Sequence, residues 1–322
     1  MTAKKPSKAA NKKEIISIVV PCYNEQEVID LCHEEITKVV DDLAYNFEII
    51  YINDGSTDTT FDKLQDIQKS DKRVVVINLS RNFGKEAAMT AGIDNVNGDA
   101  LIILDADLQD PPALIPDLIN LWKETGADVV YGQRLAREGE TWFKKFTANS
   151  FYKVINFIAS NVEIPRNTGD FRLMNRRSID ALKQLREKHR FMKGLFAWIG
   201  YKQVALQYNR APRAAGETKW GYIGLWNLAM EGIAGFSTTP LRVASFFGLI
   251  ISILSFIFAA YIIIRTLIFG IDVPGWATLT VMISFFSGIQ LLSIGILGEY
   301  IGRIFGEAKR RPLYFIENIY KK

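Results

Sequence analysis

The chain of 322 residues is 48% hydrophobic and 12% aromatic and carries a formal net charge of +4. This apolar content excludes an intrinsically disordered protein, and so mild a charge gives no indication of a nucleic-acid partner. The length allows two domains, because a single domain usually holds about 100–200 residues.

The first 13 residues, MTAKKPSKAANKK, form a basic segment with several lysines and no acidic residue. No apolar core of the kind that a signal peptide requires follows them. We expect a disordered tail that either contacts anionic lipid head groups or only adds solubility.

After this tail, short apolar strands alternate with helical patterns. The predicted strands are Ile15 to Val20, Phe47 to Ile52, Val74 to Leu79, Ala100 to Leu104 and Asp128 to Tyr131, and the predicted helices lie near 25–43, 57–69, 84–95 and 112–124. Such alternation predicts an α/β domain with a mostly parallel sheet covered on both faces. Ligands of such sheets bind beyond the carboxyl ends of the strands.

Polar clusters follow the first four predicted strands, at this carboxyl edge. They are PCYNEQE, NDGSTD, SRNFGKE and DADLQD. Each alone is compatible with ordinary turn chemistry, because Asn, Asp, Gly and Ser are common turn residues. The sequence contains neither GxGxxG nor GxxxxGK[ST], so dinucleotide-binding and P-loop fingerprints are absent and phosphates must be held differently.

The stretch ALIILDADLQDPP places two carboxylates at the end of a predicted buried strand. Asp105 and Asp107 are two residues apart, so in extended chain both project to the same side. Close like charges repel unless a cation lies between them, and an oxygen-only cluster suits Mg²⁺ or Mn²⁺. The alternative is a solvated loop, because a three-residue pattern recurs by chance. A metal here would neutralise a diphosphate, while Asp54 and the segment from Pro21 to Glu25 hold a nucleoside.

Two long apolar stretches lie in the last third of the chain. The stretch from Val243 to Ile264 carries no charge and would span about 33 Å as a helix. The stretch from Trp276 to Gly298 contains Gln290 as its strongly polar residue. We predict a hairpin of two transmembrane helices, with two buried core helices as the alternative.

Basic residues flank the outer ends of this hairpin, with Arg242 before it and Arg303 after it. Because positive flanks stay in the cytoplasm, we expect a multi-pass protein of the inner or plasma membrane with its catalytic domain and both termini cytoplasmic. Cys22 and Cys32 then lie in a reducing compartment and are expected to be free thiols.

Three glycines recur every four residues along the extension of the second apolar stretch, at positions 298, 302 and 306. This spacing lets helices approach closely. It makes a homo-oligomer plausible, although the same stripe would also suit packing within one chain.

In their order along the chain, the motifs closely resemble those of the family 2 inverting glycosyltransferases. The matching segments are IVVPCYNEQEVI, IIYINDGSTDTT, LSRNFGKEAAMTAG, DADLQDPP and TGDFRLM. With TTPLR before the apolar stretches and GEYIGRI after them, the chain is similar to the polyprenyl-phosphate glycosyltransferases of the GtrB type, which resemble dolichol-phosphate mannose synthase. This similarity covers nearly everything after residue 14 and implies a GT-A type fold.

The resemblance also implies an organisation of the whole chain. The segments are the tail (1–13), a cytoplasmic glycosyltransferase domain (14–219), interfacial juxtamembrane helices (220–242), two transmembrane helices (243–264 and 276–298, together 243–298) and a cytoplasmic C-terminal tail (299–322).

Binding residues for a UDP-sugar donor follow from the resemblance. The residues implied to bind the uridine are Pro21, Tyr23, Glu25 and Asp54. The residues implied to hold the divalent metal and the diphosphate are Asp105, Asp107 and Gln109. The lysines implied to bind donor or acceptor phosphates are Lys85, Lys144, Lys145 and Lys219.

Three further residues join Asp105 and Asp107 as catalytic candidates. Arg134, after VVYGQ, and Arg213, in RAAGETKWG, match arginines that face phosphates in relatives, a task that suits guanidinium groups. Asp170, in TGDFRL, would orient the acceptor or a sugar hydroxyl. The alternatives are an ordinary surface charge for each arginine and an ordinary turn residue for the aspartate.

The chain departs from the family pattern at two places. Ala215 stands where relatives usually carry an aromatic residue before GE[ST]K, which puts packing on the donor or the lipid in doubt. Ala148 and Asn149 stand where the soluble relatives carry a hydroxyl four residues after a basic residue, here Lys144 or Lys145. These lysines are therefore the weaker acceptor-phosphate candidates.

The activity that the resemblance implies is metal-dependent, inverting transfer of a sugar, first of all glucose, from a UDP-sugar to polyprenyl (undecaprenyl) phosphate. The acceptor is already an anion near pH 7, because the second pKa of a phosphate monoester is about 6, so no strong general base is needed. The alternatives are the same reaction with UDP-N-acetylglucosamine or an aminoarabinose donor, a non-catalytic membrane scaffold or transporter subunit, and a tethered nucleotidyltransferase that releases pyrophosphate.

Overall fold

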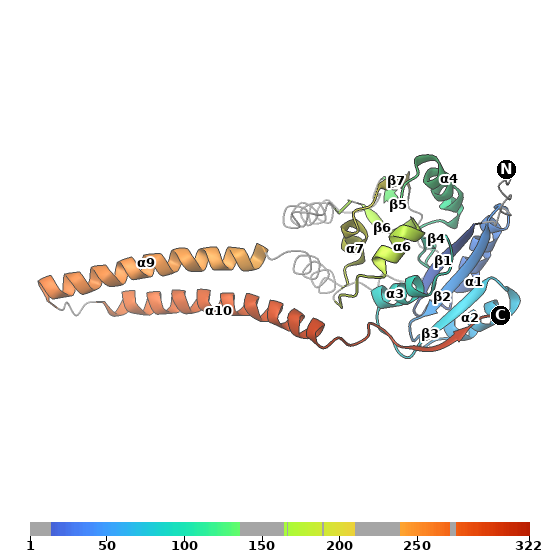
Figure 1. Ribbon diagram of the computed structural model, residues 1–322. Helices are drawn as coiled ribbons and strands as arrows, with labels where there is room; N and C mark the ends of the chain where they lie inside the picture. The colour runs from blue at the N-terminus through green and yellow to red at the C-terminus, as the bar shows by residue number, and fades with distance from the viewer. Residues whose placement is uncertain (1–13, 136–163, 166, 189, 210–238, 271–274) are drawn as a thin grey trace, which may run out of the picture.

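The structure is a computed structural model that describes residues 14–135, 164–165, 167–188, 190–209, 239–270 and 275–322. Its α/β part is built on an eight-stranded sheet with the order β7-β5-β6-β4-β1-β2-β3-β8 (Figure 1). The strands are β1 (Ile15–Cys22), β2 (Asn46–Asn53), β3 (Val74–Leu79), β4 (Ala100–Ile103), β5 (Val129–Arg134), β6 (Thr168–Asn175), β7 (Gln203–Tyr208) and β8 (Ile316–Tyr320).

Parallel pairing dominates this sheet. Strands β4, β1, β2 and β3 are mutually parallel, and β5 is parallel to β7. Strand β6 runs antiparallel between β4 and β5, and β8 runs antiparallel along β3 at one edge. The mostly parallel α/β fold expected from the sequence is confirmed, and the polar clusters after β1 to β4 share one edge of the sheet.

Helices cover both faces because the strands are apolar on both sides. One core cluster joins Ile18 of β1 to the face that holds α1, α2 and α4, and a second joins Val19 to the face of α3, α6 and α7. The helices are α1 (Ile29–Val40), α2 (Thr60–Ser70), α3 (Lys85–Asn95), α4 (Ile115–Thr125, after the 3₁₀ turn η1, Pro112–Leu114), α6 (Arg176–Leu182) and α7 (Met192–Trp198). Successive residues of β1 thus serve opposite layers.

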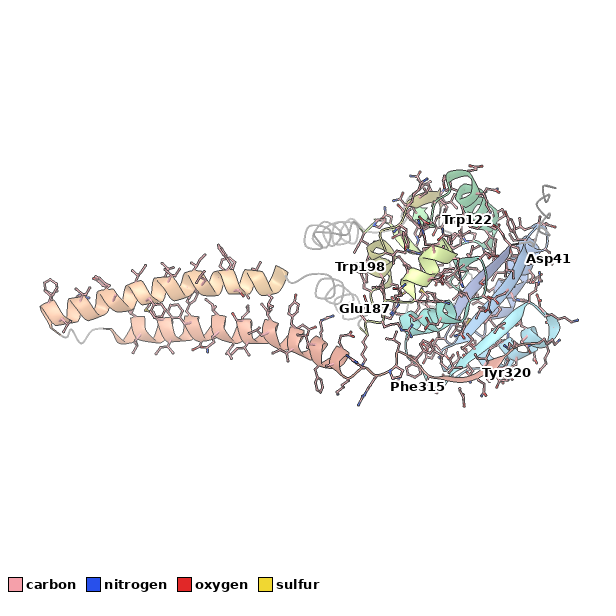
Figure 2. The ribbon with its side chains drawn as sticks, in the orientation of Figure 1. Asp41, Trp122, Glu187, Trp198, Phe315 and Tyr320 are labelled. Atoms are coloured by element: carbon pink, nitrogen blue, oxygen red, sulfur yellow. The ribbon has the colours of Figure 1, made fainter. Side chains whose placement is uncertain are left out.

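Two long helices, α9 (Thr239–Phe269) and α10 (Trp276–Ala308), lie side by side and project away from the α/β part (Figure 1). Their apolar side chains point outward along most of their length (Figure 2), and Leu267 is 81% exposed. Within the described residues, Phe285–Ala308 is long and apolar enough to cross a membrane, and Val243–Phe258 is a shorter apolar stretch.

Both helices are longer than the apolar stretches that predict them. Helix α9 continues beyond Ile264 through Arg265, and α10 continues beyond Gly298 to Ala308. The reason is that a charged residue ends an apolar run without ending a helix, since Arg, Glu and Lys have high helix propensity.

The segment expected to be a C-terminal tail, 299–322, contains the end of α10 and a strand, β8. Following α10, the chain returns to the α/β part and adds β8 to the edge of the sheet (Figure 1). Pairing with β8 gives the edge strand β3 backbone hydrogen-bond partners. The sequence does not predict this strand, because its five residues alternate only weakly between apolar and polar side chains.

Candidate active site

Strand register brings two of the candidate carboxylates together. In the antiparallel pair of β4 and β6, Ile103 lies opposite Arg172. Following each strand two residues further toward the carboxyl edge leads from Ile103 to Asp105 and from Arg172 to Asp170. Asp170 does not lie in a turn before a strand, the alternative considered for it from the sequence, but within β6, beside β4.

Lys85 lies between these two carboxylates. Its Nζ is 2.7 Å and 2.8 Å from the two carboxylate oxygens of Asp105, and 2.8 Å from Oδ2 of Asp170. Lys85 is the first residue of α3, Asp105 lies just after β4 and Asp170 lies in β6, so three separate elements bring the triad together. The side chains of Asp105 and Asp170 are only 20% and 14% exposed, and that of Lys85 is 43% exposed.

The charges of the triad depend on one another. Burial lowers the pKa of Lys85, but the carboxylates of Asp105 and Asp170 outweigh burial and raise it well above its usual value. Burial raises the pKa of Asp105. For Asp170, burial is outweighed by the ammonium groups of Lys85 and Lys193, so its pKa lies below its usual range. At neutral pH the triad therefore contains a charged lysine and an ionised Asp170.

Glu86, next to Lys85, is a site residue that the sequence analysis missed. Burial, reinforced by the charge of Asp170, raises its pKa to about 8 despite Lys85. Its Oε2 is buried and has no hydrogen-bond partner. A glutamate in the first turn of a helix has an ordinary helix-starting role, so nothing in one sequence distinguishes it.

Asp107 and Gln109 lie in the loop after β4. Strand β4 ends at Ile103, and Ala106 and Asp107 lie in a turn, so the alternation of an extended strand does not reach Asp107. Leu108, which follows, is in the left-handed region at φ 56°. The Gln109 N–H donates to Asp107 Oδ1 at 3.2 Å.

The donor set of this loop suits a divalent cation in its chemistry. Asp105, Asp107 and Gln109 offer only oxygen atoms, and Oε1 of Gln109 is a buried acceptor without a hydrogen-bond partner. Among the described residues, no three His, Cys, Asp or Glu side chains cluster closely enough to hold a metal. In the structure, the Lys85 ammonium is the cation that faces Asp105.

Asp54, predicted to bind uridine, is engaged by backbone groups. Its Oδ1 accepts the N–H of Phe83 at 2.7 Å, and its Oδ2 accepts the N–H of Gly84 at 2.9 Å. The side chain is buried, and burial raises its pKa although these hydrogen bonds lower it. Asp54 therefore fixes the loop that leads to Lys85.

The other predicted uridine residues lie on the same edge, at the end of β1. The loop that contains Tyr23 and Glu25 is tied to the loop after β2, because the N–H of Asn24 donates to Ser56 Oγ at 3.0 Å and the N–H of Glu25 donates to Thr60 Oγ1 at 2.8 Å. Tyr23 is 37% exposed. Pro21 lies within β1, so these residues and Asp54 border one rim.

Arg134 lies at the end of β5, beside the triad. Its Nη2 is 3.5 Å from Asp110 Oδ1, and its Nε donates to the Tyr208 hydroxyl at 3.4 Å. Burial alone would lower the pKa of Arg134, but the Asp110 carboxylate outweighs burial, so the pKa lies above its usual value. A Cβ at Gly169 would lie 2.8 Å from Nη2, so glycine at this position of β6 makes room for the guanidinium beside Asp110.

Asp110 and Tyr208 were not predicted as site residues. Tyr208 donates a hydrogen bond to the buried Asp110, which orients Arg134. Asp110 is the last residue of the DADLQD motif, so the motif could have identified it. Tyr208 lies far from this motif in the sequence and belongs to no motif that marks it as a site residue. Several predicted residues lie outside the described residues: Arg213, Lys144, Lys145, Lys219, Ala148, Asn149 and Ala215.

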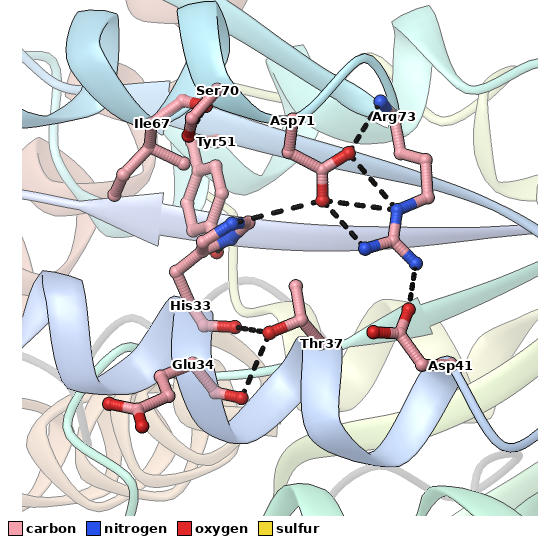
Figure 3. Close-up of polar contacts among 9 residues, drawn as sticks. All are labelled: His33, Glu34, Thr37, Asp41, Tyr51, Ile67, Ser70, Asp71 and Arg73. Atoms are coloured by element: carbon pink, nitrogen blue, oxygen red, sulfur yellow. Dashed lines mark hydrogen bonds and ion pairs between the residues drawn. The ribbon is translucent and has the colours of Figure 1, made fainter.

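A separate polar cluster lies at the opposite, amino-terminal end of the strands (Figure 3). Arg73, just before β3, binds Asp71 through two nitrogens and also binds Asp41 after α1. His33 contacts Tyr51 and Asp71, and burial lowers the histidine pKa although Asp71 opposes this. These groups satisfy one another and tie α1 to the turn before β3, which is a structural role.

Comparison with known proteins places the described site within a family. The profile described as glycosyl transferase family 2 matches residues 17–183, which include the whole triad. An uncharacterized glycosyltransferase of Synechocystis sp. is 50% identical over 305 residues, which cover 95% of each chain.

Two further relatives carry more specific names. The prophage bactoprenol glucosyl transferase homolog of Escherichia coli is 45% identical, over 95% of this chain and 99% of its own length. The bactoprenol glucosyl transferase of Shigella phage SfV is 46% identical, over 94% of this chain and 98% of its own length.

Proposed function

The chain belongs to glycosyl transferase family 2, and we propose that it transfers glucose from UDP-glucose to a polyprenyl phosphate with inversion at the anomeric carbon. The observation that carries this proposal is the contact of Lys85 with Asp105 and Asp170 at the carboxyl edge of the sheet. The names of the phage and prophage relatives support glucose as the sugar and a polyprenyl acceptor.

Asp170 is suited to orient a substrate rather than to remove a proton. Lys85 and Lys193 hold its pKa below the usual range despite burial, so its carboxylate is a weak base. A carboxylate fixed in this way accepts a hydrogen bond from a sugar hydroxyl and keeps the sugar aligned. The attacking phosphate is itself an anion, so the reaction needs alignment and charge more than a general base.

The cationic side chains supply that charge. Lys85 contacts Asp170, Arg134 lies against Gly169 beside Asp110, and both cationic side chains keep their protons at neutral pH. Asp105, Asp107 and Gln109 would hold a Mg²⁺ or Mn²⁺ ion, which when bound stabilises the departing diphosphate. In this proposal, the rim of Pro21, Tyr23, Glu25 and Asp54 receives the uridine, and Arg213, Lys144, Lys145 and Lys219 remain candidates for phosphate contacts.

We propose that α9 and α10 form the membrane hairpin that brings the soluble donor to the lipid acceptor. The exposed apolar side chains of both helices and the length of Phe285–Ala308 support this, as do the basic flanks of the hairpin. The domain at 14–219 and both termini would then be cytoplasmic, with interfacial helices at 220–242.

The test measures transfer of radiolabel from UDP-glucose into an organic phase that contains polyprenyl phosphate, with detergent-purified full chain and Mg²⁺ or Mn²⁺. We expect metal-dependent transfer that the double substitution Asp105→Asn, Asp107→Asn abolishes. Asp66→Asn, at an exposed ion pair on α2, is the matched control and keeps full activity.

Two other readouts separate the alternatives. If label is transferred only from UDP-N-acetylglucosamine or from an aminoarabinose donor, the proposed sugar is wrong but the proposed type of reaction stands. Release of pyrophosphate in place of UDP would identify a nucleotidyltransferase. A protein that binds no nucleotide and transfers no label from any donor would overturn the proposal in favour of a non-catalytic membrane protein.

A further inference from the structure

Phe315, the residue just before the C-terminal strand β8, contacts the loop that delivers Lys85. This loop, residues 80–84, is called the lysine loop here. The N–H of Ser80 donates to the carbonyl oxygen of Phe315 at 3.0 Å. The Phe315 ring packs on the Phe83 ring with their centroids 6.3 Å apart. The chain that returns from α10 therefore holds the lysine loop by its backbone and by an aromatic side chain.

A chain of buried amides links β8 to the neighbouring rim. Asn78 of β3 donates to Glu317 Oε2 at 2.7 Å, and Asn53 of β2 donates to Asn78 Oδ1 at 2.7 Å. The N–H of Ser56 donates to Asn53 Oδ1 at 3.3 Å. Asn53 and Asn78 are 3% and 8% exposed, so each depends on its partner for hydrogen bonding. This amide chain ends in the loop that contains Asp54.

The lysine loop is therefore held from two sides. Asp54 binds the N–H groups of Phe83 and Gly84 on one side. A Cβ at Gly55 would lie 2.5 Å from the backbone of Arg81, so the two loops touch there. Phe315 supports the other side, and Glu317 reaches the Asp54 loop through Asn78 and Asn53.

We propose that β8 and the residue before it position the donor site, with Phe315 as a positioning residue for the lysine loop and Glu317 as one for the Asp54 loop. The strand follows α10 after the connection 309–315, so the polypeptide beyond α10 completes the donor site on the α/β part. This inference rests on the proposed function for its substrate, and its test includes a measurement that does not need one.

The competing explanation is that β8 only covers the open edge of β3, as edge strands require. Tyr320 distinguishes the two explanations, because it lies on the same strand but packs its ring on Phe61 of α2, with centroids 5.8 Å apart. Loss of Tyr320 weakens the strand without touching the lysine loop, which makes Tyr320→Ala the matched control.

The experiment compares Phe315→Ala, Glu317→Ala and Tyr320→Ala in the full chain in detergent. Hydrogen exchange without nucleotide reports the protection of the backbone N–H groups of residues 80–84. Calorimetry measures the Kd for UDP with Mn²⁺, and steady-state rates give KM and kcat. For Phe315→Ala and Glu317→Ala we expect faster exchange in the lysine loop and a Kd for UDP raised about tenfold, which equals about 1.4 kcal/mol. We expect KM for the donor to rise with a smaller change in kcat.

The conservative variant Glu317→Gln provides a rescue, because its amide oxygen still accepts the hydrogen bond from Asn78. We expect it to restore much of the loop protection and of the UDP affinity. Equal losses in all three alanine variants, or unchanged exchange in residues 80–84, would overturn the proposal and leave β8 as an edge cover. If the wild type binds no UDP, the proposed donor is wrong, and exchange alone decides whether β8 positions the loop.

Discussion

At the scale of single residues, Lys85 keeps two carboxylates together that would otherwise repel. Substitution Lys85→Met removes the ammonium between Asp105 and Asp170 while keeping the length of the side chain. We expect kcat/KM to fall by about 10²–10³, the usual loss when a preorganised charged contact is removed from a site. Initial rates of label transfer measure this. Lys69→Met, at an exposed ion pair, is the control and leaves the rate unchanged.

Glu86 gives a pH dependence of stability with a defined sign. Its pKa is raised from 4.5 to about 8 in the folded chain, chiefly by burial. Between these values the unfolded chain has lost the proton that the folded chain keeps, so this residue lowers stability as pH rises. The loss of folding stability caused by Glu86 is absent below pH 4.5 and complete above about pH 8.

Substitution Glu86→Gln removes this titration. We expect the difference in Tm between Glu86→Gln and the wild type to grow in favour of the variant as pH rises from 5 to 8, and then to level off. Thermal unfolding followed by circular dichroism across this range measures it. A difference that stays constant with pH would show that Glu86 does not titrate there, and the exposed Glu124→Gln serves as the reference.

At the scale of elements, α3 carries Lys85 and Glu86 and is held close to the sheet by a glycine. A Cβ at Gly92 would lie 2.5 Å from Val19 Cγ1 and 2.8 Å from Ile52 Cδ1. We expect Gly92→Ala to lower the free energy of unfolding by about 1–3 kcal/mol, because overpacking exceeds the gain of up to about 1 kcal/mol in helix propensity. Urea unfolding of the full chain measures it.

The control for this substitution is Gly288→Ala in α10, where a Cβ would meet nothing within 4 Å among the described residues. Equal stability of Gly92→Ala and the wild type would mean that α3 can shift away from the sheet. In that case Lys85 would move with it, and the rate of label transfer would fall although the fold survives.

The elements that the sequence predicted well are those with strong local patterns. Strands β1 to β4 follow short apolar runs, helices α1, α2 and α4 follow amphipathic runs between them, and the carboxyl-edge loops follow from parallel pairing. Strand β6 was missed as a neighbour of β4, because antiparallel insertion depends on non-local pairing that no local pattern encodes. The contact of Lys85 with Asp170 follows from that insertion, so the sequence identified both residues but not their proximity.

At the scale of the whole molecule, the chain leaves the α/β part before α9 and returns to it after α10. Among the described residues, a Cβ at Gly298 or Gly302 would meet no atom within 4 Å, so these two glycines do not pack against α9. The return through β8 fastens the end of the chain that follows α10 to the edge of the sheet. The proposed hairpin therefore predicts one orientation, with the connection between α9 and α10 on the far side of the membrane.

This orientation is testable with single cysteines, because the native Cys22 and Cys32 are 2% and 0% exposed and should not react in the folded chain. Phe269→Cys lies at the end of α9, where the side chain is 80% exposed, and Lys321→Cys lies at the exposed C-terminus. In intact cells we expect a membrane-impermeant maleimide to label Phe269→Cys, and to label Lys321→Cys only after permeabilisation. Labelling of both positions from outside would contradict the hairpin, because two spans must return the C-terminus to the side of the catalytic domain.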